Sequence, residues 1–132
     1  MDTGATSHMT HSKGTLLNYF PLKSSNSHSI IVGNGAMLPV HGHGHVSIPS
    51  PSQPLLLKHV LHSPSLIKNL ISVRKFTRDN NVSIEFDPFG FSVKDLGTKN
   101  TIMRSNSTGD LYPFQLTHGD TVPSHIFSFF VF

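Results

Sequence analysis

The sequence predicts a mostly-β fold, a small β-barrel with one short helix at about residues 64–78. Its 132 residues include ten Phe, nine Pro and ten Gly, a composition typical of short strands joined by turns. Several segments also alternate apolar and polar residues with a period of two, as a strand with one buried face requires. A chain of this length is expected to form one domain with one modest core.

The N-terminal half contains a predicted hairpin. Residues 16–20 are expected to form a short strand or one turn of helix, which Pro21 ends. Residues 29–32 predict a strand, and Asn34-Gly35 after it predicts a hairpin turn because both residues accept a positive φ. The return strand, 38–48, alternates strictly. Its glycines and apolar residues share one face: Leu38, Val40, Gly42, Gly44, Val46 and Ile48.

The only helix is expected after a buried strand. Residues 55–61 form a nearly continuous apolar run, which predicts a central strand. Ser63 and Pro64 then resemble an N-cap followed by proline at the first helical position. Apolar residues recur at helical spacing between residues 66 and 73, and basic residues between 74 and 78 suit the negative end of the helix dipole.

A second hairpin is predicted in the C-terminal half. Residues 82–86 and 91–94 alternate apolar and polar side chains. The turn between them, 87–90, has Pro second and Gly fourth, as a type I turn prefers. Residues 102–103 and 111–114 predict weaker strands.

Composition excludes several classes of protein. The chain has no cysteine, so it forms neither disulfides nor thiolate metal sites. Lys and Arg are scattered apart from a cluster at 74–78, so the distribution of charge gives no indication of direct nucleic-acid binding. Neither a signal peptide nor an apolar run long enough for a bilayer is apparent, so we expect an intracellular, cytoplasmic protein without a membrane partner. The apolar end, 125–132, is open to three interpretations: a last strand, an adhesive tail or a product of truncation.

The first residues carry a motif with catalytic potential. In aspartic proteases two carboxylates lie about 3 Å apart and share one proton, so that one acts as a base on water and the other polarises the scissile carbonyl. Asp2, Thr3 and Gly4 supply an acid, a small hydroxyl and a residue that allows two loops to approach closely. The motif occurs once, so a pair of carboxylates requires two chains. An ordinary turn is the alternative interpretation.

The ten histidines raise a different hypothesis, a His-rich metal-binding module. His41, His43 and His45 alternate along one predicted strand, so their side chains lie about 6.6–7 Å apart on one face. Two such imidazoles can bind one zinc ion. Polar residues on the solvent side of a strand are the default, however. We therefore expect no metal and no cofactor, and keep the metal site as an alternative.

Five segments together resemble copia-type LTR retrotransposon polyproteins, the first four the protease region and the last the segment that leads into the pre-integrase region. They are, in chain order, 2–10 (Asp-Thr-Gly-Ala-Thr-Ser-His-Met-Thr), 32–35 (Val-Gly-Asn-Gly), 40–44 (Val-x-Gly-x-Gly), 60–73 (Val-Leu-His-x-Pro-x-Leu-x-Lys-Asn-Leu-Ile-Ser-Val) and 109–112 (Gly-Asp-Leu-Tyr). Each segment alone is loose, but their order is specific. The resemblance defines a domain over 1–116 and leaves 117–132 as a divergent tail.

The resemblance implies a retropepsin-like closed β-barrel. It also implies an aspartic endopeptidase that cleaves its own polyprotein as a homodimer, without a cofactor. Asp2 matches the catalytic aspartate, and Thr3 and Gly4 match the loop that clasps the partner. The turn at Gly33, Asn34 and Gly35 is the candidate flap over the substrate.

The sequence departs from the family at its start. Family members carry a strand with a tryptophan just before the aspartate, whereas this chain begins at Met1. We therefore expect an N-terminally truncated fragment. The alternative to an active protease is a catalytically inert β-barrel fragment of a decayed retrotransposon.

Overall fold

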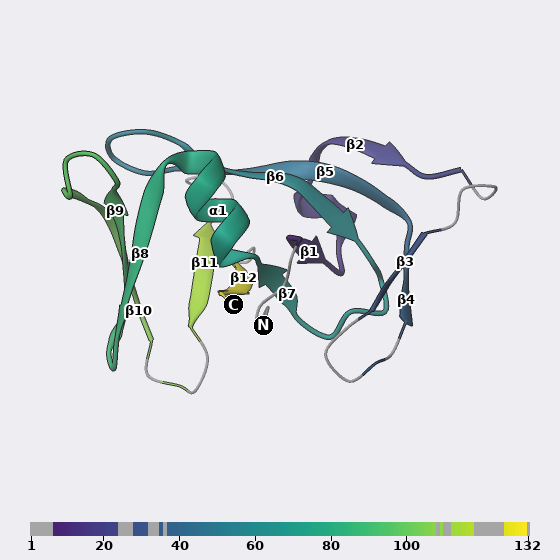
Figure 1. Cartoon of the computed structure of the whole chain (residues 1–132). Coiled ribbons are helices and arrows are strands. Elements are labelled where there is room, and N and C mark those ends of the chain that lie inside the picture. The colour runs from purple at the N-terminus through teal and green to yellow at the C-terminus, as the bar shows by residue number, and fades with distance from the viewer. Residues whose placement is uncertain are drawn as a thin grey trace.

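The structure is a computed structural model that describes residues 7–23, 28–31, 35, 37–107, 109, 112–117 and 126–131 (Figure 1). Asp2, Thr3 and Gly4 therefore lie outside the described residues. The described elements are β1 (Met9–Thr10), a short 3-10 helix (Lys13–Thr15), β2 (Leu17–Pro21), β3 (His28–Ile31), β4 (Met37–Val40), β5 (Gly42–Ile48), β6 (Leu55–His62), β7 (Asn69–Ile71), α1 (Val73–Asn80), β8 (Val82–Asp87), β9 (Gly90–Asp95), β10 (Thr101–Asn106), β11 (Pro113–Thr117) and β12 (Ile126–Val131).

The described strands form three sheets. The largest has the order β11-β12-β7-β1-β6-β5-β2, a second contains β8, β9 and β10, and the β3–β4 hairpin forms the third. The three-stranded sheet stands beside α1 at one end of the molecule, and the β3–β4 hairpin lies at the other end (Figure 1). The prediction of a mostly-β fold with one helix is confirmed, and residues 55–61 do lie in a central strand, between β1 and β5.

Closure of the sheet differs from the prediction. Among the described residues, the edge strands β2 and β11 stand at opposite ends of the large sheet and do not pair with each other. The sheets are therefore not closed into a barrel. One reason is local. After β2 the chain leaves the large sheet, and β3 and β4 pair with each other, in the register His28↔Val40 to Ile31↔Met37, instead of extending that sheet.

The predicted return strand 38–48 is divided at His41. Its first part, β4, pairs with β3, whereas its second part, β5, pairs with β2 and β6. At the junction, the His41 N–H donates to the carbonyl of His62 and the His41 carbonyl accepts from the N–H of Leu22, both at 2.8 Å. The alternation itself is confirmed, since Val40, Gly42, Gly44, Val46 and Ile48 are all buried.

The helix begins later than predicted. α1 starts at Val73, because Ser72 and not Ser63 is its N-cap and accepts from the N–H of Lys75 at 3.3 Å. Asn69–Ile71 instead forms β7, whose Leu70 pairs with Met9. The helical spacing of the apolar residues was thus misleading, because β1 needs a second strand beside it and the pairing outweighs local propensity. The helix ends at Asn81, which adopts a left-handed conformation with φ of 55°.

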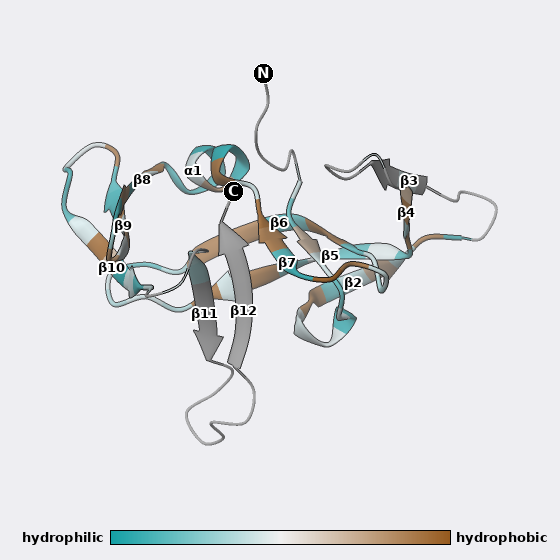
Figure 2. Ribbon diagram, turned by 90° about the horizontal axis from the view of Figure 1, so that it is seen from below, coloured by the Kyte–Doolittle hydropathy of each residue, from teal (hydrophilic) through white to brown (hydrophobic). Residues whose placement is uncertain are grey.

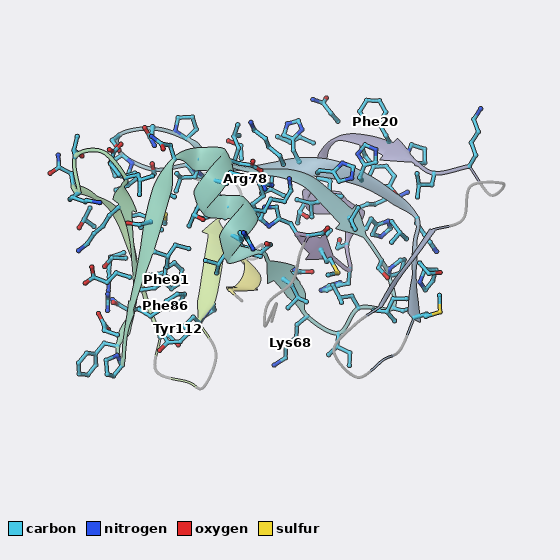
Figure 3. The ribbon with its side chains drawn as sticks, in the orientation of Figure 1. Phe20, Lys68, Arg78, Phe86, Phe91 and Tyr112 are labelled. Carbon is cyan, nitrogen blue, oxygen red and sulfur yellow. The ribbon has the colours of Figure 1, made fainter. Side chains whose placement is uncertain are left out.

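One hydrophobic core joins the large sheet, α1 and the three-stranded sheet. Hydrophobic residues concentrate on the central strands (Figure 2). Phe76 from α1 and Phe91 from β9 are fully buried in this core. Phe86, Phe91 and Tyr112 pack together beside β8, β9 and β11 (Figure 3), with the Phe86 and Tyr112 ring centroids 4.9 Å apart. The hairpin predicted at 82–94 is confirmed as β8 and β9.

The apolar C-terminal segment contains a strand. β12 lies between β11 and β7, antiparallel to the first and parallel to the second. Of the three interpretations of residues 125–132, the last strand describes it. No described helix combines the length and the apolar character that crossing a membrane requires.

Candidate functional site

The strand that follows the Asp-Thr-Gly motif is held in the middle of the large sheet. Met9 of β1 lies beside Leu61 of β6 in parallel register and beside Leu70 of β7 in antiparallel register. The Leu61 N–H donates to the carbonyl of His8 at 2.9 Å, and the Ser63 N–H donates to that of Thr10 at 2.9 Å. Hydrogen bonds on both sides fix the backbone of β1.

A buried asparagine ties the far end of β1 to β7. Asn69 is 5% exposed, and its side-chain oxygen accepts from the Thr10 hydroxyl and from the His11 N–H, both at 2.9 Å. The Thr10 hydroxyl in turn accepts from the N–H of Ser12 at 3.2 Å. Buried polar groups that are satisfied in this way fix one conformation, since any shift would leave a donor unpaired.

His8 immediately precedes β1, on the side of the Asp-Thr-Gly motif. Its side chain is fully buried, and Nδ1 accepts from the N–H of Ser72 at 3.0 Å, at the start of α1. Within the described part of the chain, Nε2 has no hydrogen-bond partner. Burial, reinforced by the positive charge of Lys75, lowers the pKa of His8 to about 4. The imidazole is therefore neutral at pH 7, as its acceptor role requires.

A groove of about 540 Å³ lies between β2, the end of β6 and the β3–β4 hairpin. It is lined by Lys13, Tyr19, Pro21, Leu22, Lys23, Ser29, Pro39, Val40, His41 and His62. These residues offer hydroxyl, imidazole and ammonium groups and include no carboxylate, so the groove suits carbonyl oxygens or anionic groups of a ligand.

A hydrogen-bonded pair forms the floor of this groove. The Tyr19 hydroxyl and Nδ1 of His62 lie 2.9 Å apart, and the His41 ring meets that of His62 edge-on at 5.7 Å. Burial and then the neighbouring His41 lower the pKa of His62 below its usual value, so a neutral ring accepts from the tyrosine at pH 7. Gly42 has no room for a side chain, because a β-carbon would collide with the backbone carbonyl of Phe20 as well as with the Tyr19 hydroxyl and ring.

The residues predicted from the sequence fall partly outside this geometry. As noted, Asp2, Thr3 and Gly4 precede the described residues, and Gly33 and Asn34 of the candidate flap are also outside them. Gly35 is described, and its φ of 85° agrees with the predicted turn between β3 and β4. The hairpin is therefore confirmed, and its role as a flap stays a prediction.

The three histidines predicted to share a face are divided, since His41 lines the groove, whereas His43 and His45 line a separate hollow together with His59. The His41 ring lies against His62, whereas the His43 ring lies 4.5 Å from that of His59. Within the described ranges, no three histidine or acidic side chains gather closely enough to hold a metal ion.

Sequence reasoning missed Tyr19, His62 and Asn69 as members of the site. Tyr19 and His62 are 43 residues apart in the chain and meet only because β2 and β6 both flank β5. Asn69 had a usable signal, since a polar residue inside an apolar segment is often a buried hydrogen-bonding group.

Comparison with known proteins identifies the family to which this chain belongs. Residues 1–81 match the family described as Pol polyprotein, beta-barrel domain. The match covers more than half of the chain, so the chain belongs to this family.

Two relatives from Arabidopsis thaliana are similar along nearly the whole chain. They are the Retrovirus-related Pol polyproteins from transposons RE1 and RE2, each 33% identical over 92% of this chain. The resemblance to retrotransposon Pol polyproteins is thereby confirmed. The chain spans 8% of the length of each relative. No solved structure matches the fold.

Proposed function

We propose that this domain acts as a homodimeric aspartic endopeptidase on a Pol polyprotein, with Asp2 of each subunit as the catalytic group. One observation carries the proposal. In a chain of the Pol beta-barrel family, the Asp-Thr-Gly motif leads through the buried His8 into β1, the strand held between β6 and β7. Catalysis needs precise positioning, and β1 offers a fixed strand from which the motif before it can be held.

The chemistry follows from pairing two like charges. Two Asp2 carboxylates brought together by a dimer would share one proton, because both cannot ionise at about 3 Å. The ionised carboxylate would take a proton from water while the protonated one polarises the scissile carbonyl. Thr3 would bond across to the partner loop, and Gly4 would let the loops approach.

The groove beside the β3–β4 hairpin offers a path for an extended peptide. His41 and the two lysines are hydrogen-bond donors suited to peptide carbonyls and acidic side chains, and the Tyr19 oxygen, whose proton goes to His62, can accept from a peptide N–H. The hairpin forms one wall through Ser29, Pro39 and Val40. A hairpin bordering the groove is the geometry that a flap over a substrate requires.

The test is self-processing. The full chain with a downstream linker and reporter would be incubated from about pH 4 to about pH 7, and cleavage followed on a gel. Asp2→Asn is the catalytic variant. Asp95→Asn is the matched control, because Asp95 is the last residue of β9 and accepts from the N–H groups of Gly97 and Thr98 in the turn that follows, which an asparagine oxygen can also do. Circular dichroism at each pH would verify that all proteins are folded.

Cleavage by the wild type and Asp95→Asn but not by Asp2→Asn supports the proposal. Sedimentation of the active protein as a dimer is the accompanying expectation. Folded proteins that never cleave the linker would instead identify an inert domain of a decayed element. Cleavage that persists in Asp2→Asn refutes the role given to Asp2.

A further inference from the structure

A row of rings lies on the outer face of the large sheet, on the side opposite the core. The ring row consists of Phe20 from β2, His43 from β5 and His59 from β6. The Phe20 and His43 rings are stacked, with centroids 5.5 Å apart and planes inclined by 29°, and the His43 and His59 centroids are 4.5 Å apart. Phe20 is 61% exposed and points away from the body of the protein (Figure 3).

Two irregularities in strand pairing create this surface. The first is a bulge in β2. Leu17 pairs with His45 and Phe20 pairs with His43, so two residues of β2 lie opposite one residue of β5; one of the two, Asn18, has a φ of 51°. In β6, Lys58 and His59 together lie opposite one residue of β5, and His59 has a φ of 55°. Such a bulge turns two consecutive side chains to one side, so Lys58 and His59 are both exposed.

The ring row borders a hollow of about 380 Å³. Its lining residues are Asn18, Phe20, His43, Gly44, His45, Leu56, Lys58 and His59. They combine flat rings, one amide, one ammonium group and no carboxylate. The hollow therefore suits a planar group attached to an anion better than it suits an aliphatic chain.

The charge around this face has one sign. No Asp or Glu occurs between Asp2 and Asp79. The described acids beyond that point lie on α1, β8 and β9. Asp79 pairs with Lys75, Glu85 with Lys94 and Asp87 with Arg104, whereas Asp95 accepts from the N–H groups of Gly97 and Thr98. Among the described residues, Lys58 forms no salt bridge. An anion approaching the ring row would thus meet positive charge without nearby carboxylate repulsion.

We propose that the ring row and Lys58 bind single-stranded nucleic acid. Unpaired bases would stack on Phe20 and the two imidazoles, and Lys58 would neutralise a phosphate. Stacking of bases on aromatic side chains beside a basic groove is a general and sequence-tolerant mode of binding single strands. A duplex keeps its base faces covered, and the Asp and Glu side chains of an acidic peptide have no aromatic face to stack on the rings.

This site is separate from the proposed protease groove. Tyr19 points to the core side of β2, where it contacts His62, whereas its neighbour Phe20 points outward to His43. Substitution of Phe20 is therefore expected to leave Asp2-dependent cleavage unchanged. Failure of either proposal would leave the other standing.

The test is fluorescence anisotropy of the full chain with a labelled single-stranded oligonucleotide of about 12 nucleotides and with the same sequence as a duplex. We expect the single strand to bind more tightly, and Phe20→Ala to weaken binding about tenfold. Phe20→Trp should restore it. Lys58→Gln should weaken binding and reduce the salt dependence, measured from about 50 to about 200 mM, by about one released counterion.

Matched controls lie at the acid-bearing end of the molecule. Phe89→Ala removes a ring that is 75% exposed in the β8–β9 turn, and Lys99→Gln removes an exposed charge in the turn before β10. Neither should change affinity. The proposal is overturned if Phe89→Ala weakens binding as much as Phe20→Ala does, or if the folded wild type does not bind the single strand. It is also overturned if the duplex binds with equal affinity, or if polyglutamate of equal charge displaces the oligonucleotide. A change of oligomeric state in Phe20→Ala would assign the face to contacts between copies and also refute the proposal.

Discussion

Acidification is expected to destabilise this fold through His8. Its ring is fully buried, its Nδ1 accepts from the Ser72 N–H, and burial lowers its pKa to about 4 from the ordinary value of 6.5. The folded state therefore resists protonation, whereas the unfolded chain takes up a proton below about pH 6.5. The stabilisation is complete above pH 6.5 and is lost as the pH falls through the window from about 6.5 to about 4.

The size of the effect follows from this difference in pKa. A full shift of this extent corresponds to about 3 kcal/mol of the free energy of unfolding. Between about pH 7 and about pH 5, linkage gives a loss of about 2 kcal/mol from His8 alone. Burial also lowers the pKa of His59 and of His62, so both act in the same direction. Because domains of this size have a total stability of only about 5–15 kcal/mol, the loss is measurable.

The assay is urea denaturation at a series of pH values, for the wild type and for His8→Asn. An asparagine oxygen occupies nearly the position of Nδ1 and can accept from the Ser72 N–H, but it does not titrate. The variant should be less stable at pH 7, because a ring is lost from a buried site, and should lose about 2 kcal/mol less than the wild type on going to about pH 5. Equal pH dependence in both proteins, or an NMR titration of His8 near its ordinary pKa, would refute the reasoning.

Three further substitutions test the packing around the site. Asn80→Ala removes a side chain that accepts from the N–H of Leu56 at 2.7 Å and donates to its carbonyl at 2.8 Å, so urea denaturation should show a loss of about 2 kcal/mol; an unchanged midpoint contradicts this. Phe76→Ala empties a fully buried position of α1 and should cost about 3–5 kcal/mol in the same assay, whereas a cost under about 1 kcal/mol would mean that the helix is not docked. Gly42→Ala places a methyl group against the Tyr19 ring and the Phe20 backbone carbonyl, so it should cost about 1–3 kcal/mol and shift the tyrosine ring signals in NMR spectra; unshifted signals would show that the contact is absent.

The strands were predicted well wherever local pattern and burial agree. The hairpin of β8 and β9 has clean alternation and a turn sequence that fits, and β6 is a nearly continuous apolar run, so both were predicted correctly from the sequence. The helix was placed too early because residues 66–71 have helical spacing but form a loop and β7. Their conformation depends on β1, which is far away in the sequence and must pair on both sides.

The features of the candidate site also divide into those that depend on neighbouring residues and those that depend on long-range pairing. The Asp-Thr-Gly motif, the glycine alternation at 42 and 44, and the order of the family segments could be read directly, since they depend only on neighbouring residues. The Tyr19–His62 pair, the support of β1 by Asn69 and the ring row could not. Each joins side chains from different strands, and the bulges in β2 and β6 that aim them are not visible as a period in the sequence.

The sequence by itself thus determined three things: membership of a retrotransposon Pol polyprotein family, the strand-rich character of the chain, and the position of the Asp-Thr-Gly motif, whose Asp2 is the only acid before Asp79. These are properties of composition, spacing and short-range turn chemistry. Only the tertiary structure decided that the described sheets stay open, that the helix begins at Val73, and that histidines spread over the sequence separate into a buried ring, a groove and an outer ring row. The physical reason is that strand register and bulges, which are set by long-range pairing, fix the face to which each side chain points.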